Sequence, residues 1–112
     1  MSNMSVPDTP LGSSLLAMTA ASIQRCDLPD REIMVARIAA LAAMGAPALS
    51  YTLNAAAAAE SGLSADDAEG ILIAVAPVIG TARTVAAATG ITEGLGIAIA
   101  LADGDEAQGG GS

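Results

Sequence analysis

Small apolar side chains dominate this sequence, and alanine is the most frequent of them. Hydrophobic residues make up 53% of the chain, yet Tyr51 is its only aromatic residue. Alanine is the best helix former, and small side chains let two helix backbones approach closely. The residues 71–78 are β-branched enough for a buried strand, but alanine-rich segments surround them and a helix-capping signal precedes them. The composition therefore predicts an all-α fold, a small helical bundle without a sheet.

Capping residues divide the chain into helical segments. Thr9 and Pro10 form a start signal for a helix that runs to about Gln24. A second helix is expected from about Pro29 to Met44, because Gly45 suits the left-handed position that follows a helix. Each of these segments repeats apolar residues at helical spacing, so each has a face to bury.

The second half of the chain contains the same kind of signals. A third helix is expected from Pro47 through the alanines 55–59, ending at Gly62. The residues 64–67 resemble a capping box that opens a fourth helix. Pro77 and Gly80 are expected to break or kink that helix, and short helices should follow at about 81–88 and 92–101.

A single domain is expected, because 112 residues are too few for two. We assign a flexible tail to residues 1–8, one helical domain to 9–102, and a disordered acidic and glycine-rich tail to 103–112. The N-terminus lacks the basic and apolar regions of a signal peptide, and no stretch has the roughly 20 apolar residues of a membrane span. The sequence therefore predicts a cytoplasmic protein that does not bind membranes.

Charge and composition exclude several kinds of function. The net charge is −8 and the only basic residues are four arginines, which argues against nucleic-acid binding. The absence of histidine, with a single cysteine, excludes a Cys/His zinc site, a histidine base and an intrachain disulfide. We expect no metal and no cofactor.

Several of the expected helices are apolar on more than one face. A chain of this size buries one face of each helix, so a ligand, a membrane or other subunits must cover the surplus apolar surface. A homo-oligomer is the simplest explanation.

Residues 30–88 resemble the carboxymuconolactone decarboxylase family, which includes the alkylhydroperoxidase D-like proteins. The similar features are an apolar helix from Asp30 to Gly45, a motif helix, the turn at residues 62–67, and an apolar helix that ends with Gly80 and Arg83. The stretches 50–54 and 75–83 look especially like an actinobacterial branch of the family. The resemblance implies an alkylhydroperoxidase D-like bundle that assembles through its helices, as a trimer or hexamer first and a dimer second.

The catalytic residues of that family are missing here. The positions of its Cys-x-x-Cys and following His align with Pro47, Ser50 and Asn54. The resemblance therefore implies an oligomeric scaffold or small-ligand-binding protein that lacks the family's chemistry. The alternative is a decarboxylase- or hydroperoxidase-like enzyme that uses other residues, with Cys26, Glu32 and Arg37 as its candidates.

Three residues are candidates for binding a ligand. Ser50 and Asn54 share a helix face and could line a pocket or bond to each other, and Arg83 could hold an anion at a helix N-terminus. Arg37 could also bind an anion. We favour an ion pair, within the chain or across a subunit interface, with a carboxylate such as Glu60 or Asp67, because an unpaired buried guanidinium is costly.

Three other residue types have more ordinary interpretations. Cys26 is expected to be a small buried residue rather than a reactive thiol. Tyr51, with its apolar body and polar tip, suits an interface. Gly90 and Gly94 have the spacing of a close helix contact.

Overall fold

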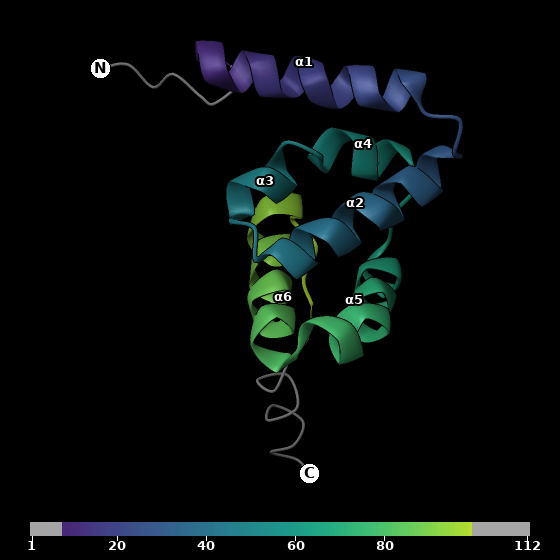
Figure 1. The fold of residues 1–112 in the computed structure, drawn as a ribbon, viewed down its shortest axis with the longest axis vertical. Helices are drawn as coiled ribbons and strands as arrows, with labels where there is room; N and C mark the ends of the chain where they lie inside the picture. Colours follow the sequence, from purple (N-terminus) through teal and green to yellow (C-terminus); the bar gives the residue numbers. More distant parts are fainter. Residues whose placement is uncertain (1–7, 100–112) are drawn as a thin grey trace.

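The computed structural model describes residues 8–99, and within this range every regular element is a helix. The all-α prediction is therefore confirmed for the described part of the chain. The helices are α1 (Pro10–Arg25), α2 (Asp30–Met44), α3 (Ala48–Thr52), α4 (Ala55–Glu60), α5 (Ala65–Ile79) and α6 (Thr81–Leu95). Figure 1 shows α2–α6 gathered into one body, with α1 lying across one end of it. The predicted tails lie outside the described residues, apart from Asp8.

The capping signals place several helix ends as expected. The hydroxyl oxygen of Thr9 accepts a hydrogen bond from the N–H of Gly12 at 2.9 Å, which satisfies one free donor of α1. Gly45 ends α2 with a φ of 68°, a conformation that costs glycine nothing. Ser64 and Asp67 form the reciprocal hydrogen bonds of a capping box at the start of α5.

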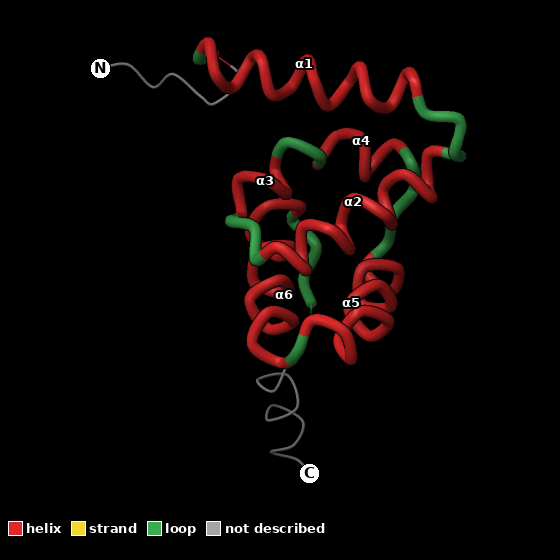
Figure 2. The backbone as a smooth tube through the Cα atoms, in the orientation of Figure 1, coloured by secondary structure: helices red, strands yellow, loops and turns green. Residues whose placement is uncertain are grey.

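The expected third helix is two short helices instead. Figure 2 shows the break between α3 and α4, at Leu53 and Asn54. Asn54 has φ and ψ of −107° and 4°, outside the helical region, and its side-chain amide donates to the carbonyl of Ser50 at 3.1 Å. Asparagine side chains that bond to nearby backbone offer the chain an alternative to the helix. The alanine run alone gave no sign of this break.

The last two expected helices are one. α6 continues through Gly90 to Leu95, and the part of the prediction beyond residue 99 lies outside the described residues. Pro77 does not break α5 either, because it lies in the exposed last turn of a helix that ends before Gly80. At Gly80, where φ is 91°, a glycine lies at a helix end, as expected. Gly90 instead lies inside α6, where the absence of a side chain lets Tyr51 approach.

At Gly90 and Gly94, α6 packs closely against α3. A Cβ atom on Gly90 would lie 2.7 Å from the Tyr51 ring, and one on Gly94 would lie 2.5 Å from the carbonyl oxygen of Ala48. Real Cβ atoms do not approach so closely, so only glycine lets α3 lie against α6. The spacing of these two glycines, a weak signal in the sequence, coincides with a close helix contact.

Tyr51 is a core residue, so the expectation that it suits an interface is wrong. Its side chain is fully buried beneath the α3–α6 contact. Its hydroxyl has no hydrogen-bond partner among the described residues, and burial raises the pKa of this phenol. The Tyr51 side chain fits here because Gly90 and Gly94 have no Cβ atoms, which would collide with it.

The hydrophobic core belongs to the body alone. Its buried residues come from α2–α6 and from Leu63 in the connection before α5: Met34, Ile38, Ala42, Tyr51, Ala58, Leu63, Ala68, Ile71, Leu72, Ala87, Ala88 and Ile91. α1 supplies none of them, and Gly12 is its only buried residue. None of the helices within residues 8–99 has both the length and the hydropathy to cross a bilayer.

Candidate functional site

An open groove of about 400 Å³ lies where α1 meets α2 and the start of α4. Its apolar part comes from both α1 and α2, and its polar part includes one charged residue, Arg37. The residues that line it are Met18, Thr19, Ser22, Arg37, Ala40, Leu41 and Asn54. This volume falls within the usual size range of small-molecule sites.

The guanidinium of Arg37 forms hydrogen bonds only to neutral acceptors among the described residues. One nitrogen donates to the side-chain oxygen of Asn54 at 2.7 Å, and another donates to the backbone carbonyl of Thr19 at 3.0 Å. A guanidinium has five N–H donors, so these two bonds leave others for a ligand. Arg37 is half-buried, and no carboxylate from residues 8–99 forms an ion pair with it.

Within one chain, the expected ion pair between Arg37 and Glu60 or Asp67 is therefore not formed, and an ion pair across a subunit interface stays a prediction. Asp67 instead binds Arg31 through two parallel hydrogen bonds, one of them at 2.8 Å. The bond from Arg31, together with the backbone N–H of Ser64, holds the pKa of the Asp67 carboxyl well below its usual range. Asp67 pairs with Arg31 and not with Arg37, because the two arginines lie on different faces of α2.

Asn54 connects the helix break to the groove. It is only 8% exposed, and its amide nitrogen is held by the Ser50 carbonyl. This bond directs the amide oxygen toward Arg37, which donates to it. The break between α3 and α4 and the position of the Arg37 guanidinium are therefore parts of one hydrogen-bonded arrangement.

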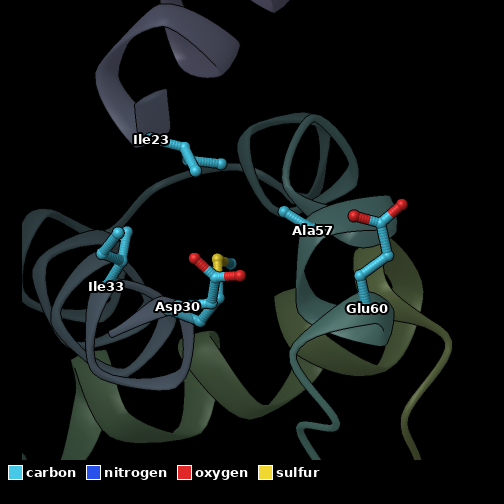
Figure 3. Close-up of a pocket in the computed structure, with 6 residues that line it drawn as sticks. Ile23, Asp30, Ile33, Ala57 and Glu60 are labelled. Carbon is cyan, nitrogen blue, oxygen red and sulfur yellow. The ribbon is translucent and has the colours of Figure 1, made fainter. Parts of the chain in front are cut away.

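A smaller pocket lies near the end of α1 and has a volume of only about 40 Å³. Figure 3 shows Asp30 of α2 and Glu60 of α4 on its wall, together with Ile23, Ile33 and Ala57. A water molecule occupies about 30 Å³ in the liquid, so this pocket has room for water rather than for an organic ligand. The described residues also hold no cluster of three or more metal-binding side chains.

The other residues expected at a site lie away from the groove. Cys26 is half-buried where α1 ends, and Glu32 is exposed in the first turn of α2. Arg83 is exposed and donates to the carbonyl of Ala43 at 2.7 Å, so it ties the start of α6 to the end of α2. Ser50 supplies its backbone carbonyl to Asn54. The structure thus brings together only Arg37 and Asn54 as groove-lining side chains.

Sequence reasoning missed the contribution of α1. Met18, Thr19 and Ser22 line the groove, and the part of Thr19 that binds Arg37 is its backbone carbonyl. A carbonyl carries no sequence signature, so no pattern could have identified it. The only available signal was that the helix at residues 10–24 has apolar residues on one flank.

Comparison with known proteins finds no relative of this chain. No family model, curated protein or solved structure matches the chain. The similarity of residues 30–88 to the carboxymuconolactone decarboxylase family stays a prediction.

Proposed function

We propose that this protein binds a small molecule that carries an anionic group on an apolar body, and that it does so without catalysis. The observation that supports this most strongly is Arg37, a half-buried cation with neutral hydrogen-bond partners in an open apolar groove. A carboxylate or sulfonate would satisfy the remaining guanidinium donors with charge-assisted hydrogen bonds. Met18, Ala40 and Leu41 would contact the apolar part of the same molecule.

The residues of the groove favour binding over chemistry. Of the described residues, those that line it include no carboxylate, cysteine or tyrosine, so they offer no group that exchanges a proton near neutral pH. The candidates for an enzyme, Cys26 and Glu32, lie elsewhere on the chain. Arg37 is the only one of the three enzyme candidates in the groove, and its fixed positive charge suits binding.

We also propose that the chain is a homo-oligomeric member of the alkylhydroperoxidase D-like group, with a trimer or hexamer expected first. Large apolar side chains remain exposed on a single copy, the most exposed being Val78 at 84%, Met44 at 76%, Leu11 at 70% and Ile73 at 68%. Covering such side chains is favourable by about 25 cal/mol for each Å² of apolar area removed from water. Assembly through helix faces would bury them.

Binding of anilinonaphthalene sulfonate tests the ligand proposal, because this fluorescent probe joins one sulfonate to an apolar body. We expect wild type to bind it and Arg37→Gln to bind it at least about tenfold more weakly, a loss of about 1.4 kcal/mol. Arg83→Gln is the matched control, since Arg83 lies outside the groove, and it should change the affinity less than about twofold.

A second pair of variants leaves the hydrogen bonds of Arg37 in place. Ala40 and Ala36 are both exposed on α2, but only Ala40 lines the groove. Ala40→Glu should repel the probe and reduce its binding, whereas Ala36→Glu should not. Absence of probe binding by wild type, or equal effects within either pair, would contradict the proposal.

A further inference from the structure

One flank of α1 bears a row of side chains that a single copy leaves partly or largely exposed. Leu11 is 70% exposed, Met18 is 62% exposed, and Leu15 between them is half-buried. Together with Ser22 they are spaced by four, three and four residues, which is the spacing of a coiled-coil seam. We call these four residues the α1 seam. Such spacing brings side chains onto one stripe that fits a second helix.

The α1 seam also borders the groove. Met18 and Ser22 belong to both features, so a helix packed on the seam would lie over the groove's open side. A typical small-molecule site covers most of the surface of its ligand, and an open groove does not. The site of a single copy therefore lacks one wall, on the side where the seam is exposed.

Charge indicates what covers this flank. Residues 10–24 contain no charged side chain, although the whole chain has a net charge of −8. Two copies of so acidic a protein repel each other across most surfaces, but not across a neutral helix. A cationic partner would be attracted to acidic side chains, and this flank has none. An uncharged helix suits contact with another copy.

We infer that α1 packs in an antiparallel pair with α1 of a second copy, and that this pair closes the groove. The spacing of the seam reads the same in both directions, so antiparallel pairing sets Leu15 beside Met18 of the second copy and Leu11 beside its Ser22. A parallel pair would instead bring the two Arg25 side chains together, because Arg25 follows Met18 by seven residues on the same flank.

The second copy thus contributes residues to the site. Its Leu11 and Leu15 form the missing apolar wall opposite Met18 and Ser22. This inference rests on the proposed function only for the use of the groove, while the pairing of the helices stands on the seam and its neutrality. A two-fold contact of this kind is compatible with a hexamer, which combines two-fold and three-fold axes.

Two matched substitutions test the pairing. Leu11→Glu places a charge in the seam at a residue that does not line the groove of its own chain, and Ala17→Glu places the same charge on an exposed position of α1 outside the seam. Light scattering after size exclusion gives the mass of each assembly. We expect wild type to have at least twice the 10.8 kDa of one chain, Leu11→Glu to have half the wild-type mass or less, and Ala17→Glu to match wild type.

Binding of anilinonaphthalene sulfonate by the same proteins tests the closure of the groove. Leu11→Glu should bind at least about threefold more weakly than Ala17→Glu, because its groove stays open. A wild-type mass of 10.8 kDa, or equal masses for the two variants, would overturn the pairing. A lower mass with unchanged probe binding would overturn the closure. If wild type binds no probe, the proposed function fails while the masses still decide the pairing.

Discussion

α1 and the body formed by α2–α6 contain the same kinds of apolar residue but place them differently. The body buries a shared core of apolar side chains, and within it Tyr51 packs against Gly90 and Gly94. α1 is as long as any helix of the body, yet none of its side chains belongs to that core. It provides groove-lining residues and an exposed neutral flank instead. The core therefore lies in the body, and α1 supplies part of the groove's lining.

The largest difference should come from one substitution made in both regions. Leu72 is 4% exposed in the core, whereas Leu16 is half-buried on α1 and outside the core. Leu72→Ala should lower the free energy of unfolding by about 3 kcal/mol, and Leu16→Ala by about 1 kcal/mol or less. Denaturant unfolding followed by the fluorescence of Tyr51 measures this, because the only aromatic side chain lies in the body. Equal losses would show that α1 is part of the core's cooperative unit.

The next largest effect on stability should come from replacing glycines with alanine, and its sign should depend on whether the glycine packs against another helix. Gly94→Ala puts a methyl group against the Ala48 carbonyl, which cannot move aside, and should cost about 2 kcal/mol. Gly70 lies in α5 with nothing near its missing Cβ atom. Gly70→Ala should therefore raise stability by about 0.5–1 kcal/mol through helix propensity. The sign of the change in melting temperature distinguishes the two variants, and a stabilising Gly94→Ala would contradict the contact between α3 and α6.

The smallest effect concerns the ion pair on the body surface. Because Arg31 lowers the pKa of Asp67 in the folded chain, this pair stabilises the fold above the carboxyl's ordinary pKa of about 4. That stabilisation is lost as the pH falls below 4 toward the folded-state pKa. Asp67→Asn should therefore melt below wild type at pH 7, and the difference should shrink in strong acid. Melting curves across this pH range check it, and a difference that grows as the pH falls would contradict it.

The sequence predicted the parts of the fold that depend on local chemistry. Thr9, Gly45 and Ser64 mark helix ends through their own hydrogen bonds or backbone angles, and these ends were placed correctly. The sequence failed at Asn54 and Gly90, because contacts distant along the chain act there, at Asn54 together with its local bond to the Ser50 carbonyl. Arg37 holds the Asn54 side chain at the break, and Tyr51 fills the space beside Gly90.

The candidate site, like the fold, could be predicted from the sequence only in part. Arg37 and Asn54 stood out in the sequence, one as a cation among the apolar residues of the expected second helix and the other as the residue at a family motif position. Their meeting could not be foreseen, because it depends on how α2 packs beside the break. The role of α1 was also hidden, since its contact with Arg37 uses the backbone of Thr19.

Hydrogen exchange of the Leu11→Glu variant tests most directly whether α1 is independent of the body. In this variant the seam is blocked, so α1 keeps only its sparse contacts with its own chain. The account predicts that amides of α1 exchange at least about tenfold faster than the core amides of α2, α5 and α6, whose exchange stays as slow as in wild type. Equal protection of α1 and the core, or loss of protection in both together, would contradict it.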